Sequence, residues 1–232
     1  MLIPFFIHII PAHFLAKPYP ILYLCKMQLA SNLLENAVNE FAKLPGIGKK
    51  TALRLVLHLL KQDTAEVSHF GETITKMRTD IQFCNRCGNV SDAAICTICA
   101  NPLRNQRLIC VVENIRDVIA IENTQQFSGT YHVLGGIISP LDGVGPEQLN
   151  IESLTNRIQT EETEELIFAL NPNIQGDTTI YYIQKKIQQL PCKITTIARG
   201  IAFGGELEYA DELTLARSLT NRLPVGSYIS NR

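Results

Sequence analysis

The chain has 232 residues, of which 46% are hydrophobic and 19% charged, and its formal net charge is −1. This composition excludes a disordered chain and predicts a globular protein of one or two domains with a hydrophobic core. The charges are unevenly distributed. Between Lys43 and Lys61 there are five Lys or Arg and no acid, whereas between Asp142 and Leu170 there are seven Asp or Glu against Arg157 alone. The sequence therefore joins a basic N-terminal part to an acidic middle.

Residues 1–26 differ from the rest because they contain no acid and several prolines. The apolar run Leu2–Ile10 is too short to span a bilayer, and no basic region or small-residue cleavage site makes it a signal peptide. Regular amphipathic patterning begins only after Met27. We interpret residues 1–26 as a leader outside the native protein, with Met27 as the true initiator. The alternative is a disordered or loosely docked extension.

A helical hairpin is predicted next. Ser31 can cap a first helix, whose apolar face consists of Leu34, Ala37, Val38 and Phe41. A turn containing Gly46 and Gly48 leads directly into a second helix. Its apolar positions have the i, i+3, i+4, i+7, i+8 spacing of one packed face, and they are Ala52, Leu55, Val56, Leu59 and Leu60. A third amphipathic helix, with Val67, Phe70, Ile74 and Met77 on one face, follows.

The turn and the second helix have the features of a phosphate-binding hairpin. Glycines let the backbone approach an anion, and the unpaired N–H groups at the helix start face it with the positive end of the helix dipole. Lysine and arginine side chains on the next turn add positive charge. This helix-hairpin-helix pattern predicts contacts to the DNA backbone without base reading, made by Gly46, Gly48, Lys49, Lys50 and Arg54. The alternative is an ordinary hairpin whose basic face is only solvated.

Two Cys-x-x-Cys pairs follow, Cys84 with Cys87 and Cys96 with Cys99. Four thiolates can surround one zinc ion, and Gly88 permits the tight turn after the first pair. A site filled by four protein ligands has no open position for water, so its predicted role is structural. The alternatives are a rubredoxin-like iron site and disulfides, but disulfides would leave three other cysteines as an odd set.

An α/β pattern begins after the cysteines. The continuous apolar run Leu108–Val112 is typical of a buried parallel strand, and further strands are predicted at 131–134, 166–170 and 194–197. A crossover helix is predicted at 115–122 and a last helix at 211–223. Alternating strands and helices predict a doubly wound, mostly parallel sheet.

Two acids stand out in this half. Glu113 directly follows the first strand and Asp142 lies in a long loop, and together they could hold Mg²⁺ at the edge where open α/β sheets bind ligands. The structural alternative is that Glu113 caps its helix and Asp142 forms a turn with Gly143. Cys110, within the strand, is interpreted as a small core residue.

The order of these modules resembles that of the RecR family of bacterial recombination proteins. The resemblance is carried by the hairpin segment 44–52, the four cysteines, Val111-Val112-Glu113, the segment 132–143, and Ala198-Arg199-Gly200 with the segment 204–209. From Met27 to the end it implies an α+β protein of several modules, with a helix-hairpin-helix region at 27–80, a four-cysteine zinc finger at 81–104, an α/β Toprim domain at 105–198, and a Walker-B-like segment with a helix at 199–232. The leader at 1–26 lies outside the resemblance.

The resemblance implies a non-enzymatic mediator of DNA repair. Proteins of this family form a ring-shaped tetramer that can encircle DNA, and they act with RecO and RecF to load RecA on gapped DNA coated by single-strand-binding protein. The expected cofactor is one structural zinc. Catalytic Toprim domains use an Asp-x-Asp, whereas Asp142 is followed by Gly143 and Val144, so any Mg²⁺ should bind weakly. The expected location is the bacterial cytoplasm, at the nucleoid. The alternative functions are a Toprim nuclease or primase-like enzyme and a plain zinc-stabilised scaffold.

Overall fold

The computed structural model describes residues 31–202 and 204–226. The leader predicted at residues 1–26 lies outside these residues. The chain divides into two compact units at Glu72/Thr73, within the third helix. No helix in the described ranges is long and apolar enough to cross a membrane.

The first unit is helical and contains the predicted hairpin. Ser31 accepts a hydrogen bond from the backbone N–H of Leu34 at 3.4 Å, so it caps the first helix as predicted. A small core forms around Val38, Ala52 and Val56. The helices are α1 (Asn32–Phe41), α2 (Lys49–Leu59) and α3 (Thr64–Asp80), which continues into the second unit.

The predicted apolar faces are confirmed for α1 and for most of α2. Leu34 and Phe41 pack against the buried Val38. Leu60, which we expected on the packed face, is 72% exposed because α2 ends at Leu59 and Leu60 is only its C-cap. The apolar residues of α3 also remain largely exposed.

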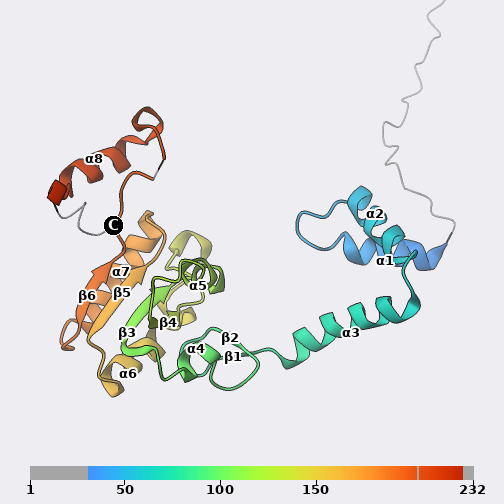
Figure 1. The fold of residues 1–232 in the computed structure, drawn as a ribbon, viewed down its shortest axis with the longest axis horizontal. Helices are drawn as coiled ribbons and strands as arrows, with labels where there is room; N and C mark the ends of the chain where they lie inside the picture. The colour runs from blue at the N-terminus through green and yellow to red at the C-terminus, as the bar shows by residue number, and fades with distance from the viewer. Residues whose placement is uncertain (1–30, 203, 227–232) are drawn as a thin grey trace, which may run out of the picture. The chain divides into compact units, whose positions relative to one another are not determined.

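The second unit contains a parallel sheet of four strands in the order β4-β3-β5-β6 (Figure 1). Its two-residue strands β1 (Gln82–Phe83) and β2 (Val90–Ser91) form a separate antiparallel pair beside the short helix α4 (Thr97–Ala100). The remaining elements are β3 (Asn105–Val112), α5 (Ile115–Glu122), β4 (Gly129–Val133), η1 (Pro140–Asp142), η2 (Pro146–Gln148), α6 (Ile151–Thr160), β5 (Glu165–Ala169), α7 (Ile174–Ile187), β6 (Lys193–Thr196), η3 (Leu207–Tyr209) and α8 (Glu212–Thr220).

Helices cover both faces of this sheet, as predicted for a doubly wound fold. On one face, Ile109 and Phe168 pack with side chains of α6 and α7. On the other, Val112 and Tyr131 pack with Val118 of α5. Because β4 and β5 lie on opposite sides of β3, the chain changes direction between β3 and β5. The carboxyl ends of these two strands therefore form the switch point where such sheets bind ligands.

The C-terminal segment is held to the sheet domain by charge. Asp177 of α7 pairs with Arg199, after β6, at 2.6 Å and with Arg217 of α8 at 3.5 Å. Asp211 caps α8 by accepting a hydrogen bond from the Thr214 N–H at 2.9 Å. The predicted last helix is thus confirmed, and the segment 204–209 contributes the 3-10 turn η3.

Candidate functional site

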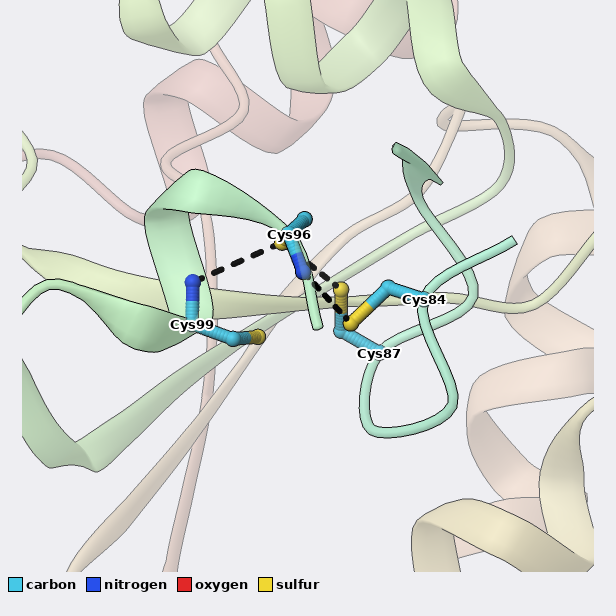
Figure 2. Close-up of side chains that lie close together, drawn as sticks. All are labelled: Cys84, Cys87, Cys96 and Cys99. Carbon is cyan, nitrogen blue, oxygen red and sulfur yellow. Dashed lines mark hydrogen bonds between the residues drawn. The ribbon is translucent and has the colours of Figure 1, made fainter. Parts of the chain in front are cut away.

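The four predicted zinc ligands are brought together by two local structures. Cys84 and Cys87 lie in the turn between β1 and β2, where Gly88 has the positive φ of +72° that the turn requires. Cys96 and Cys99 lie at the start of α4 and within it. All four side chains are buried, and their sulfurs lie within 4.8 Å of one another (Figure 2). Among the described residues, this is the one group of three or more His, Cys, Asp or Glu that could hold a metal ion.

The sulfur atoms are also ordered by backbone N–H groups. Cys96 N–H donates to the Cys84 sulfur at 3.3 Å, and Cys99 N–H donates to the Cys96 sulfur at 3.4 Å. The hydrogen bond with Cys87, and then the positive charges of Arg157 and Arg86, lower the pKa of Cys99 to about 6. The same hydrogen bond raises the pKa of Cys87, so Cys99 ionises first and zinc displaces the remaining thiol protons when it binds. The donor set is that of a closed structural zinc site, a four-cysteine zinc finger.

The zinc finger is docked on the sheet by its own backbone. The N–H of Val133, the last residue of β4, donates to the carbonyl of Cys87 at 2.7 Å. A Cβ on Gly88 would lie 3.0 Å from the carbonyl oxygen of Val133 and 3.0 Å from the Asn150 amide nitrogen. Gly88 is thus needed for close approach as well as for the turn.

An ion-pair network anchors the same module through Arg86. Its guanidinium donates to both carboxylate oxygens of Glu161, at 2.7 and 2.8 Å, and to the Cys99 carbonyl at 3.2 Å. Glu161 also accepts from Arg157 at 2.9 Å, and Arg157 reaches the carbonyl of Tyr131 at 2.7 Å. The sequence analysis missed this network, because its members are up to 75 residues apart.

The basic face of α2 is exposed and hollowed. One depression of about 590 Å³ is lined by Lys50, Arg54, His58 and Lys61, with Leu53 and Leu57 between them. Lys49, at the first position of α2, is exposed outside this lining. Lys50 and Arg54 therefore share one surface as their i, i+4 spacing predicts.

The two glycines of the hairpin turn differ in what they require. Gly46 has a φ of +78°, a backbone conformation that residues with a side chain rarely adopt. Gly48, the N-cap of α2, has an ordinary φ of −82°, and a Cβ there would have no atom within 4 Å. Neither its conformation nor packing within the chain requires glycine at position 48. The bare surface does leave the N–H groups of the first turn of α2 open to a close ligand.

Glu113 lies at the switch point of the sheet, but its partner differs from the one expected. The side chain of Asn171, which follows β5, donates to Glu113 Oε2 at 2.9 Å. The cap of α5 is Asn114, which accepts from Arg116 N–H at 2.9 Å and forms a capping box with Asp117. The alternative of Glu113 as helix cap is therefore wrong. Asn171 could have been noticed in the sequence, because it follows a predicted strand just as Glu113 does.

Asp142 belongs to a local turn. It is the last residue of η1, its carboxylate accepts from the Ser139 hydroxyl at 2.5 Å, and Gly143 follows with a φ of 71°. The structural alternative for Asp142, a turn with Gly143, is confirmed.

His132 lies in β4, directly before Val133, and is only 1% exposed. Burial, and then the nearby charge of Arg157, lower its pKa to about 4, although a hydrogen bond to the Asn150 carbonyl opposes this. In the unfolded chain this histidine has a pKa near 6.5, so as the pH falls the unfolded state binds a proton before the folded state does. We expect the unfolding free energy to decrease from pH 6.5 to 4 by up to about 1.4 kcal/mol per pH unit from this group. Denaturant titrations at several pH values from 4 to 6.5 give the unfolding free energy as a function of pH. This dependence should be steeper for wild type than for His132→Gln, and equal dependences would contradict a buried neutral histidine.

Comparison with known families matches nearly all of the described chain. The helix-hairpin-helix model of RecR matches residues 34–78, its four-cysteine zinc finger model residues 81–101, and its C-terminal model residues 200–222. A Toprim domain model matches residues 107–198. The modules predicted from the sequence are thus those of one family, in the same order.

The similarity to curated relatives points to the same family as the domain models. The chain is 57% identical over 197 residues to the recombination protein RecR of Amoebophilus asiaticus, covering 85% of this chain and 98% of the relative. It is 55% identical over 205 residues to that of Flavobacterium johnsoniae, covering 88% and 100%, and 57% identical over 195 residues to that of Bacteroides thetaiotaomicron, covering 84% and 95%. With this identity over most of its length, and with the helix-hairpin-helix and zinc finger regions in place, the chain belongs to the RecR family of DNA-binding recombination-repair proteins.

Proposed function

We propose that this protein is a non-enzymatic mediator that holds the DNA backbone through its hairpin and assembles as a ring-like clamp, a tetramer. In this role it acts with RecO and RecF to load RecA on gapped DNA coated by single-strand-binding protein. The proposed domain boundaries are those expected from the sequence, at 80/81, 104/105 and 198/199. The proposed location is the bacterial cytoplasm, at the nucleoid.

The hairpin carries this proposal. Gly46, Gly48, Lys49, Lys50 and Arg54 are the proposed DNA contacts. Gly48 leaves the start of α2 uncovered, and Lys50 and Arg54 line the hollow one turn further along. Backbone N–H groups and flexible cations suit phosphate oxygens and carry no base information. Binding to all DNA sequences alike is the consequence.

Replacing Lys50 and Arg54 together by Ala should weaken binding to every DNA sequence by the same factor. The slope of log K against log salt on duplex DNA should become shallower by about 0.9 for each lost phosphate contact, because fewer counterions are released. Fluorescence anisotropy with labelled duplexes between low and moderate salt measures both effects.

Lys43→Ala is the matched control. Lys43 is on the same hairpin, but its ammonium already pairs with Glu40 at 2.6 Å. The control should keep the wild-type slope. A double variant whose slope equals that of wild type would mean that the basic face is only solvated surface.

The surroundings of Glu113 argue against the alternative of a Toprim nuclease or primase. Metal-dependent cleavage or synthesis of a DNA strand needs carboxylates that together neutralise and hold Mg²⁺. At the switch point, Glu113 meets the neutral amide of Asn171, and Asp142 is engaged by Ser139 in its own turn. We propose that Glu113 and Asp142 bind Mg²⁺ weakly at most and act as an acidic docking surface for RecO.

Glu113→Gln and Asp142→Asn keep side-chain shape and remove charge. On the docking hypothesis they should impair RecO binding and RecA loading but leave DNA binding and zinc content unchanged. Pull-down and RecA-loading assays on the same preparations measure this, with Mg²⁺-dependent DNA cleavage as the enzyme control. Normal RecO binding by both variants refutes the docking role, and cleavage by wild type that both variants abolish refutes the non-enzymatic proposal.

A further inference from the structure

A hollow of about 610 Å³ lies between the zinc finger and the carboxyl ends of β3 and β4. Phe83 and Asn85 of the zinc finger line one side of it, and Asn114, Asn150 and Ser153 of the Toprim domain line the other. Neither Glu113 nor the basic face of α2 is part of this lining. Its volume falls within the range of about 300–1,000 Å³ that small-molecule sites occupy.

The hollow joins an aromatic ring to amide groups. Phe83 is 65% exposed although it directly precedes the buried Cys84. The side-chain oxygen of Asn114 is used by the α5 cap, which leaves its NH₂ group to donate. Asn150 uses its NH₂ on the Val133 carbonyl, at 2.9 Å, which leaves its oxygen to accept. The lining thus offers an aromatic ring together with an amide donor from Asn114 and an amide acceptor from Asn150.

Charge narrows the choice of ligand. Among the described residues that line the hollow, the only charged side chain is Arg86, whose guanidinium is held by both oxygens of Glu161. A phosphate would find no uncommitted cation in this lining. A neutral, planar group with donors and acceptors on its edge fits better, since an exposed aromatic side chain stacks on any base and amides pair with base edges.

We infer that this hollow receives an unpaired nucleobase of single-stranded DNA, which stacks on Phe83 and meets the amides of Asn114 and Asn150. The inference rests on the proposed DNA binding and adds to it a contact that only a single strand can make, because bases in a duplex are already stacked and paired. The hairpin holds phosphates, whereas the zinc finger and the Toprim edge hold a base.

The chain contains no tryptophan, so Phe83→Trp creates a single reporter at the proposed stacking position. Its fluorescence should be quenched on saturation with an oligodeoxythymidine, because a stacked base quenches an indole. A duplex with the same number of phosphates, and an abasic oligonucleotide with phosphates and sugars but no bases, should cause little quenching. Tyr181→Trp, at an aromatic of α7 that is 57% exposed, is the matched control and should respond to none of them.

Affinity supplies the second measurement. Phe83→Ala should lower the affinity for the single strand by about 5- to 150-fold, the range of stacking energies, and leave duplex affinity unchanged. Phe83→Tyr keeps an aromatic ring and should therefore bind the single strand with the affinity of wild type. Zinc content and melting temperature should stay at wild-type values in both, because the ring is largely exposed.

Equal quenching by the abasic and normal oligonucleotides, or a Phe83→Ala protein with unchanged single-strand affinity, overturns the inference. So does emission that depends on protein concentration alone, which would mean that a second copy covers Phe83. Each of these results leaves the proposed phosphate contacts of Lys50 and Arg54 standing, since those are judged from the salt slope on duplex DNA. If the Lys50 and Arg54 double variant keeps the wild-type salt slope while the base-dependent quenching is preserved, the hairpin proposal alone is refuted.

Discussion

Cys87→Ser is expected to release the zinc and to unfold the zinc finger. Wild type should contain about one zinc per chain, since four thiolates complete one tetrahedron. Zinc binding to such modules contributes roughly 10–16 kcal/mol, so release of the zinc removes a free energy comparable to the whole stability of a typical domain. Elemental analysis and thermal unfolding measure the two effects. The loop that presents Cys87 also contacts β4, at the Val133 N–H, and this edge should become exposed to hydrogen exchange.

Cys110→Ala is the matched control. Cys110 is also a buried cysteine, 3% exposed, but it lies in β3, and burial raises the pKa of its thiol to about 12. This variant should keep its zinc. Iron in the wild-type protein, a folded wild type without metal, or full zinc in Cys87→Ser would each contradict the assignment.

Glu161→Ala is expected to lower the unfolding free energy by about 3–5 kcal/mol, because it leaves two partly or fully buried guanidinium groups without their carboxylate. The Arg157 side chain is only 3% exposed and the Arg86 side chain 23% exposed. Denaturant unfolding measures the loss. Zinc transfer to a chelator should also become faster, because Arg86 no longer ties the zinc finger to α6.

The neighbouring Glu162→Ala is the control for this change. Glu162 pairs with Arg107 but is 83% exposed, so its loss should cost about 0–1 kcal/mol. The effect of Glu161 should also depend on pH. Burial raises the pKa of its carboxyl, but the hydrogen bonds from Arg86 and Arg157 outweigh this and lower it below the ordinary value of 4.5. Its contribution is therefore complete above about pH 4.5 and is lost at lower pH. Equal stabilities of the two variants at neutral pH would show that the network is solvent-screened.

The sequence by itself determined the modules, because each depends on local spacing. Two Cys-x-x-Cys pairs suffice for a metal site once a glycine allows the turn, and the hairpin follows from apolar residues at helical intervals around Gly46 and Gly48. The run Leu108–Val112 lies within a strand whose last four residues are buried, as its continuous apolar character predicts.

Only the tertiary structure decided which residues meet between modules. Asn171 meets Glu113 across 58 positions because β5, the third strand of the sheet domain in the chain, lies beside β3, the first. Glu161 meets Arg86 because α6 ends where the zinc finger docks, and Phe83 faces Asn114 and Asn150 across a hollow that neither module has alone. Periodicity and spacing report which face of an element is buried. The strand order and the docking of separate modules follow from the burial of whole surfaces, which no local pattern records.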